Sequence, residues 1–587
     1  MNKVFYFAIL GLFCISLHAQ KKEKAIDVQE VTIIKSYTPS LKEVFKIRET
    51  PMELDSIIGP KKEVDYAIFS VPVVSTFIPS KGVARKLVPK KPDPQFNSSA
   101  ALGFGNFNQL LVDYATNYSI DRRQKIDWLV YYNGFLKRIP DTQLDSRQAN
   151  MMLNVAHQYA TNKRNNYSQI NYRQHQQFFY GLREPITDLF IKENLLPKQQ
   201  LNYLSVTTQW QWYDPWVKNL SLNTFITTDS FSTSEAEVDL SSKIQTVFGG
   251  IAVTLLPEFT YLNTSFSEDF YTRSESNYTA GKGSLNLFAS KIRGSFRFKA
   301  GAKAVIGIGD EFVDQEIFIY PRVAFSYQPL KGNFAPFLNV DGDLSMNSFR
   351  SLTHENPYLA PSIRLNTSST PYRVHLGTRS KFFTGWEFEW NLLMEKNDQQ
   401  PLFRSLAKEI DRANVIGYRY ANAYEVIYGS LTKTGVQAKL SAAFKNGGRL
   451  LFKASYADFS FDNEEDTTPL YKKTALNVPE LSLLFSGTLK LGQKIQLQWY
   501  VNHFGERKNA FRDSFLGQDL QDAPVLLEDL PAFTQVDMNI HYKINERWGV
   551  YLKGNNLLNE SMYRWSKYPV YGTQLLLGMR YNFDLSF

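Results

Sequence analysis

The last fourteen residues place the strongest constraint on what this chain can fold into. From Leu575 onward every second residue is apolar, Arg580, Asn582, Asp584 and Ser586 fall between them, and the pattern ends on the aromatic Phe587. A strand with this period of two has one apolar face and one polar face. The last strand of a soluble sandwich is one interpretation. A strand that closes a transmembrane barrel, with lipid outside and water inside, is the interpretation we favour, because a soluble sheet rarely ends on an exposed aromatic residue.

The amino end predicts export. Lys3 precedes a short apolar stretch from Val4 to Leu17, and Ala19 supplies a small residue before a cleavage point. We therefore expect residues 1–19 to be a secretory signal peptide, too short to span a membrane as a helix. Cys14 is the only cysteine. The mature chain is therefore expected to have no disulfide and no thiolate metal site.

Residues 20–96 differ from everything that follows. Two short β-prone runs lie in this segment, at 28–34 and 64–71, and a Pro- and Lys-rich stretch at 86–94 ends it. That stretch has the composition of an extended linker. A segment of this length can be a small subdomain or an extended arm, but it is too short to be a large independent domain.

Residues 97–587 predict an all-β fold, a transmembrane antiparallel β-barrel of about 22 strands that begins near Ser98. Alternating segments are joined in turn by tight connections rich in Asn and Gly and by long links. The tight connections include 446–448, 491–493 and 544–546, and the long links include 397–422, 462–477, 506–532 and 557–571. Tight turns at one end and long loops at the other are typical of such barrels. The pattern at 231–266 leaves room for one hairpin more or fewer. The 33 Tyr and 43 Phe suit aromatic girdles at a membrane interface.

The carboxyl-terminal block resembles TonB-dependent receptors. The resemblance rests on Trp548–Asn559 with its Asn-Leu-Leu-Asn turn, then Tyr563, Tyr571-Gly572 and Gly578–Phe583, and more weakly on the loop motif Glu355–Leu359. Near the amino end, Gln29 followed by Glu30, Val31, Thr32, Ile33 and Ile34 resembles a TonB box, which adds an edge strand to the energising protein. An ordinary strand or linker is the alternative for these residues.

The resemblance implies a 22-strand barrel and a plug of well over a hundred residues inside it. This chain departs from the family there, because only residues 20–96 precede the first expected barrel strand. A barrel of this size is normally obstructed. Three alternatives follow: the 20–96 segment enters the barrel, the outer loops fold in, or a partner fills the space.

The polar residues do not indicate an enzyme. The seven His are scattered without metal-ligand spacing, and we expect His157 and His541 to face water. An acidic run at Asp462 and 464–466 is interpreted as a solvated loop, with a cation site as the alternative. The net charge of +9 fits solvated loops, or attraction to anionic headgroups or an acidic solute. We expect no cofactor, no metal and no nucleic-acid partner.

These patterns lead to two functional hypotheses. The first is an integral outer-membrane receptor or transporter that binds a ligand through outer loops and lumen. The second is a plugless barrel that serves as a structural or assembly subunit. The expected partners are outer-membrane lipid, the barrel-assembly machinery and TonB or other periplasmic or outer-membrane proteins. We expect a C-terminal assembly signal at Tyr581, Phe583, Leu585 and Phe587.

Overall fold

The computed structural model describes residues 95–585 except 215, 310–315, 330–332, 410–414, 464–472 and 514–523. The expected signal peptide, residues 20–94 with the TonB-box-like stretch, most of the acidic run and Phe587 lie outside the described residues. The predictions made for them stay predictions.

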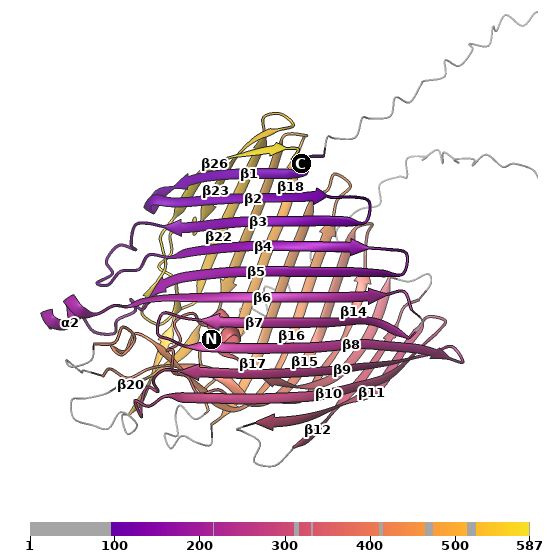
Figure 1. Ribbon diagram of the computed structural model, residues 1–587, viewed down its shortest axis with the longest axis horizontal. Coiled ribbons are helices and arrows are strands. Elements are labelled where there is room, and N and C mark those ends of the chain that lie inside the picture. The colour runs from indigo at the N-terminus through magenta and orange to yellow at the C-terminus, as the bar shows by residue number, and fades with distance from the viewer. Residues whose placement is uncertain are drawn as a thin grey trace, which may run out of the picture. The chain divides into compact units, whose positions relative to one another are not determined.

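A single antiparallel sheet closes on itself as a barrel of 22 strands (Figure 1). This confirms the expected fold class and strand number, and the first strand begins at Ser98 as expected. The wall consists of β1 (Ser98–Gly105), β2 (Gln109–Ser119), β3 (Gln124–Phe135), β4 (Ala149–Ala160), β5 (Arg164–Phe178), β6 (Lys198–Trp212), β7 (Val217–Thr228), β8 (Ser234–Phe248), β9 (Ile251–Phe266), β10 (Ser276–Arg293), β11 (Phe296–Gly309), β12 (Ile317–Tyr327), β13 (Phe334–Met346), β14 (Thr367–Lys381), β15 (Trp386–Ser405), β16 (Tyr424–Ala443), β17 (Arg449–Asp462), β18 (Leu481–Leu491), β19 (Ile495–Phe504), β22 (Phe533–Lys543), β23 (Trp548–Asn555) and β26 (Gln574–Phe583).

The two ends of the barrel differ as expected, and we call them the turn end and the loop end. At the turn end the connections are tight. Gly249 and Gly250, with φ of 56° and 75°, join β8 to β9. Two successive residues with positive φ match the right-handed twist of a hairpin, and glycine adopts them without strain. Residues 231–266 therefore form one hairpin, without a gain or loss.

The loop end carries the remaining elements. They are η2 (Asn106–Asn108), α2 (Leu189–Asn194), α3 (Phe349–Glu355), the hairpin β20 (Arg507–Arg512) and β21 (Val525–Leu530), and the short pair β24 (Tyr563–Trp565) and β25 (Tyr568–Pro569). Two of the long links differ from what the sequence predicts. The 506–532 link, expected to be a plain loop, contains the β20–β21 hairpin.

The second correction concerns the 397–422 link, which is shorter than expected. The polar run that follows Lys396 was interpreted as the start of a loop. In the structure β15 continues to Ser405, because the pairing with β16 shifts between Asn397 and Gln400 and then resumes. Gln399 has a positive φ of 57° at this irregularity. A bulge of this kind absorbs extra residues without ending the strand.

The outer face of the wall is apolar and the inner face is largely polar. On β26, Leu575, Leu577 and Met579 point outward and are 47%, 64% and 49% exposed, whereas Leu576 faces inward and is buried. Inward-facing Arg580 forms an ion pair with Asp113 of β2 at 3.1 Å. The alternation recognised in the sequence therefore separates the two faces of the wall.

The expectation for the two histidines is half right. His541 faces the lumen beside Asn539. His157 does not, because it shares the outward face of β4 with Leu153 and Val155. His157 lies near the turn end, and its Nε2 is 3.4 Å from Oε1 of Gln124 on β3. A lone polar residue at the rim of an apolar face does not break the strand pattern, so the sequence did not reveal which way it points.

The barrel closes where β26 pairs with β1, from Ser98 opposite Phe583 to Gly105 opposite Leu576. The last strand ends at Phe583 rather than continuing as expected. Beyond it, the side-chain amide of Asn97 takes the place of a strand partner. It donates to the carbonyl oxygen of Leu585 at 2.8 Å and accepts from the Leu585 amide at 2.7 Å.

The outward face of β26 yields a stability prediction. Met579→Arg places a charge on a face that is apolar on both neighbouring strands, and we expect a loss of about 2 to 4 kcal/mol in the free energy of unfolding if this position lies at the bilayer midplane. Met579→Leu at the same site should change it by less than about 1.5 kcal/mol. Denaturant unfolding in lipid vesicles measures both. Equal stability of the two variants would show that this face does not contact lipid.

Candidate functional site

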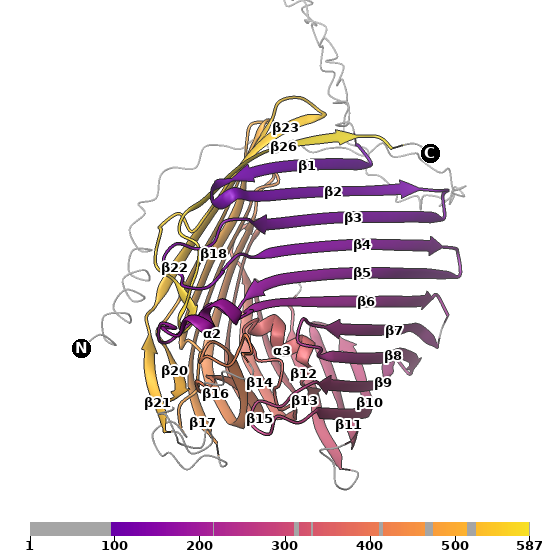
Figure 2. The ribbon, with the colours of Figure 1, turned by 60° about the vertical axis from the view of Figure 1, so that its left-hand side comes forward.

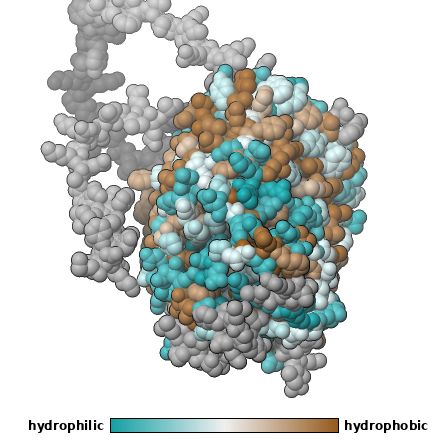
Figure 3. All heavy atoms as spheres, turned by 90° about the vertical axis from the view of Figure 1, so that its left-hand side faces the viewer, coloured by the Kyte–Doolittle hydropathy of each residue, from teal (hydrophilic) through white to brown (hydrophobic). Residues whose placement is uncertain are grey.

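The long connections at the loop end pack together into one aromatic core. It draws buried residues from the connections 136–148, 179–197, 267–275, 347–366, 406–423 and 556–573. Figure 3 looks onto this end and shows polar side chains gathered over its centre. Loops that share a buried core hold fixed positions, because each removes apolar surface of the others from water.

Tyrosine rings form the centre of this loop core. Tyr358 and Tyr568 stack with ring centroids 3.5 Å apart, and Tyr180 meets Tyr568 edge-on at 4.9 Å. The hydroxyl of Tyr180 donates to the carbonyl oxygen of Pro569 at 2.8 Å, and that of Tyr568 donates to the carbonyl oxygen of Asn422. Burial raises the pKa of Tyr358 to about 12 and the pKa values of Tyr180 and Tyr568 well above the ordinary value. The three rings are therefore neutral, and Tyr180 and Tyr568 donate hydrogen bonds to other loops.

Helix α3 carries one loop to the inner wall of the barrel. It follows β13, yet its first amides contact β8: the amides of Phe349 and Arg350 donate to the Glu235 carboxylate at 2.6 and 2.8 Å. The Arg350 guanidinium pairs with Glu237 at 2.6 Å. A carboxylate stabilises the start of a helix, where backbone amides lack partners. Figure 2 shows α3 beside the ends of β7 and β8.

A buried arginine connects two further loops. Arg419 is 1% exposed, and its guanidinium contacts Glu268 at 3.0 Å, the carboxylate of Glu409, and the carbonyl oxygen of Phe270 at 2.8 Å. A buried guanidinium needs such partners to compensate for the loss of water. Together with α3, this contact shows that outer loops fold in. The other two alternatives involve residues 20–94 or a partner and stay predictions.

The β20–β21 hairpin is attached to the loop core through a carboxylate. Glu528 accepts from both terminal nitrogens of Arg183, at 3.0 and 2.9 Å, and from Asn509 at 2.8 Å. The Arg183 guanidinium also lies over the ring of Phe511, 3.4 Å from its centroid. Although burial opposes ionisation, these donors and the positive charge of Arg183 lower the pKa of Glu528 to about 2.

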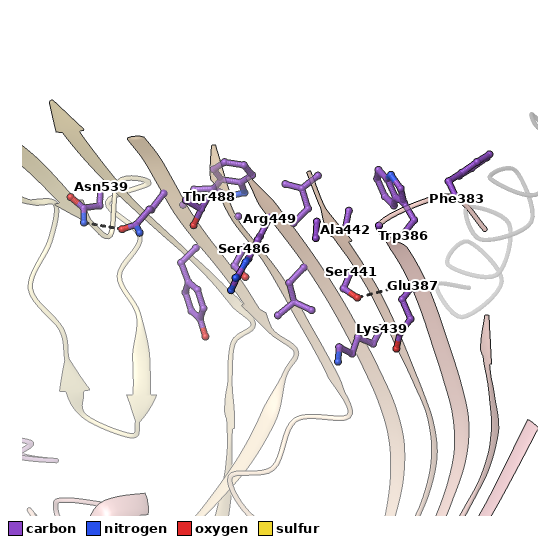
Figure 4. Close-up of a pocket in the computed structure, with 18 of the residues that line it drawn as sticks. Phe383, Trp386, Glu387, Lys439, Ser441, Ala442, Arg449, Ser486, Thr488 and Asn539 are labelled. Atoms are coloured by element: carbon purple, nitrogen blue, oxygen red, sulfur yellow. Dashed lines mark hydrogen bonds between the residues drawn. The ribbon is translucent and has the colours of Figure 1, made fainter. Parts of the chain in front are cut away.

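A cavity of about 1420 Å³ opens on the lumen near the turn end. Inward-facing polar side chains of neighbouring strands line much of it, and Figure 4 labels Lys439, Ser441, Arg449, Ser486 and Thr488 among them. The loop core and this cavity lie at opposite ends of the wall. The packed loops and the polar lumen lining therefore belong to different ends of the barrel.

The described residues hold no group of three or more His, Cys, Asp or Glu that could bind a metal ion. No helix within the described ranges has the length and hydropathy needed to cross a membrane.

The residues expected to be functional fall into two groups. Glu30, Val31, Thr32, Ile33 and Ile34 lie outside the described residues, as does Phe587. Tyr581 and Phe583 lie on the outward face of β26 with stacked rings, and Leu585 follows the strand. The loop core was missed, although the Glu355–Leu359 motif contains Tyr358. The concentration of aromatic residues within long links was the available signal.

The Glu528 contacts yield a second prediction. Because the pKa of Glu528 is lowered on folding, its contribution to stability is complete above about pH 4.5 and is lost as the pH falls toward about 2. Glu528→Gln should remove about 1 to 2 kcal/mol at neutral pH, after allowance for partial solvent screening. Hydrogen exchange of 179–197 and 525–530 measures the loosening. Asp529→Asn, in an exposed pair with Lys508 on the same hairpin, is the control and should have no effect. Equal exchange in the two variants would contradict the prediction.

Comparison with known proteins supports the fold. No family model matches the sequence, and no curated protein matches it. Among solved structures, the FrpB iron transporter of Neisseria meningitidis aligns with a TM-score of 0.58 at 11% identity, over 84% of this chain and 82% of that one. The ferric-catecholate import receptor Fiu of E. coli K12 aligns at 0.57 and 10%, over 84% and 82%. The ferric enterobactin receptor PfeA of Pseudomonas aeruginosa, in a mutant form, aligns at 0.59 and 11%, over 83% and 80%. This chain therefore has the 22-strand barrel fold of TonB-dependent receptors.

Proposed function

We propose that this protein is an integral outer-membrane receptor or transporter of a Gram-negative cell, related in architecture to TonB-dependent receptors. Its loop end faces the exterior, and both Asn97 and Leu585 face the periplasm. The observation that carries the proposal is a closed wall with an apolar outer face and a polar lumen whose outer end is occupied by packed loops. The structural neighbours named above are an iron transporter and ferric-siderophore receptors, which supports a role in solute uptake.

Under this proposal the ligand is selected at the loop end. Surface loops on a rigid barrel are where binding residues concentrate. The six connections that share the loop core present one combined surface, and residues between them are held in place by the tyrosine contacts. We assign no enzymatic role, and the loops and lumen wall act by binding.

A second candidate function is a structural or assembly subunit of an outer-membrane complex. One observation favours it. The described loops supply partners for the buried Tyr180 hydroxyl and for both terminal nitrogens of Arg419 through contacts with one another, as a fixed platform would. In that role the barrel would present a rigid outer surface to partner proteins rather than bind a solute.

We assign residues 1–19 to a signal peptide and 20–96 to a periplasmic segment that docks at the lumen. The run at 64–78 would occupy the lower lumen or its mouth, with 86–94 as the tether to β1. Support comes from Asn97, which lies at the turn end, the same end as the cavity. Glu30 to Ile34 would add a strand to TonB or another periplasmic partner.

Cell fractionation tests the location. The protein should be recovered in the outer membrane and should shift its gel mobility on heating. Phe583→Asp combined with Phe587→Asp places charge on the outward face of the last strand, near the expected assembly signal. We expect that variant to accumulate unfolded or degraded, whereas Asn582→Asp, on the inward face, should assemble. Recovery of the unaltered chain in the soluble periplasm would end the membrane proposal.

Deletion of residues 21–90 tests the periplasmic segment. If the segment obstructs the lumen, the shortened barrel should still assemble and cells should become permeable to large hydrophilic antibiotics. If permeability is unchanged while a stoichiometric partner no longer co-purifies, the segment is a docking arm and the subunit function gains support. If neither changes, both roles assigned to the segment are wrong.

A further inference from the structure

Two regions of the inner wall differ in whether their Lys and Arg side chains have ion-pair partners. On β9 to β15, the best-placed luminal cations pair with carboxylates, while Lys282 donates to the carbonyl oxygen of Leu344 and Lys299 lies over the ring of Phe288. Lys303 lies 2.8 Å from Glu258 and 2.9 Å from Asp343. Arg373 is 2.9 Å from Glu395. Charges neutralised in this way belong to the architecture of the wall and attract little from solution.

On β16, β17 and β18 the luminal cations are not paired. Lys439, Lys453, Arg449 and Lys490 all face inward, each more than a third exposed, and we call them the cationic wall. Among the described residues, none of the four forms an ion pair. Four positive charges on three adjacent strands therefore point into the lumen with their full charge available.

The strand register brings these charges close together. Lys439 lies directly opposite Lys453 on the neighbouring strand. Like charges in directly opposed positions of a sheet destabilise the pairing. On its other side Lys439 is opposite Glu389, but that carboxylate is engaged by Arg379, whose Nε is 2.7 Å away. The local arrangement therefore leaves a positive excess.

The cationic wall adjoins the turn-end cavity. Lys439 and Arg449 line it directly, and Figure 4 shows both extending from neighbouring strands beside Ser441 and Ser486. Thr488, opposite Arg449 in the β17–β18 register, adds a hydroxyl to the same lining. Lysine and arginine side chains beside hydroxyl donors are a suitable environment for carboxylate or phosphate oxygens.

We propose that the cationic wall is a binding site for a small multivalent anion, a solute carrying several carboxylate or phosphate groups. The volume of about 1420 Å³ admits a molecule of that size with its water. The chain's own residues 20–94 are a poor counter-charge, because Lys and Arg outnumber Asp and Glu among them. The inference rests on the geometry of the lumen and holds whether the barrel acts as a receptor or as a subunit.

Calorimetric titration of the purified full-length protein in neutral detergent tests the proposal, with citrate and inorganic tripolyphosphate as probes and sucrose as the uncharged control. Both anions should bind, more weakly as salt is raised, and sucrose should not. The variant Lys439→Gln/Lys453→Gln should raise Kd at least tenfold. The matched variant Lys445→Gln/Lys494→Gln removes the same charge from two turns at the same end and should leave Kd within twofold.

The unfolding temperature separates loss of binding from loss of folding. Lys439→Gln/Lys453→Gln removes opposed like charges, so it should unfold at the same temperature as the unaltered chain or a higher one. No binding of either anion by the unaltered chain would overturn the proposal. An equal rise in Kd for the two double variants would also overturn it, because the attraction would then come from the overall charge of the turn end.

Discussion

Closure of the wall is the constraint on which the rest of the structure depends. A strand without a neighbour exposes a row of unpaired amides and carbonyls, and an apolar medium offers them no partner. Here the first and last strands of the wall, which come from opposite ends of the described chain, pair along the whole length of β1. Asn97 extends the pairing with its side chain, so the backbone of Leu585 is also satisfied. Each remaining strand of the wall pairs with the wall strands that come before and after it in the sequence.

Closure creates a lumen, and the loops determine how it is used. Helix α3 lies in the connection that follows β13, and Glu235 and Glu237 of β8 bind its first residues. The tyrosine stack and Arg419 then join the remaining loops to it. The loop end is consequently a packed layer whose buried core combines the loops with inward-facing residues of the wall, such as Tyr203 and Phe403. Its rigidity comes from contacts between segments distant in sequence.

The two ends of the lumen have different chemistry. The loop end is packed with aromatic rings and internally paired charges, whereas the β16–β18 wall near the turn end leaves Lys439, Lys453 and Arg449 without ion-pair partners among the described residues. The two ends of the lumen therefore differ in the charge that they present. Under the proposed functions, a solute bound by the loops and an anion bound by the cationic wall would contact the protein at different points along the barrel axis.

The sequence by itself determined the class of fold, the strand number and the start of the wall. Period-two alternation is a local property, and most residues of β26, although not the inward-facing Leu576, indicate by their polarity which face they lie on. Turn chemistry is local as well, as Gly249 and Gly250 show. The way His157 points, the continuation of β15 past Gln399 and the β20–β21 hairpin required the structure, since each depends on neighbours rather than on pattern. The loop core and the cationic wall are also tertiary. Tyr358 and Tyr568 meet only because the fold brings separate segments together, and such contacts leave no periodic trace in the chain. Lys439 and Lys453 are opposed through the register of the β16–β17 hairpin.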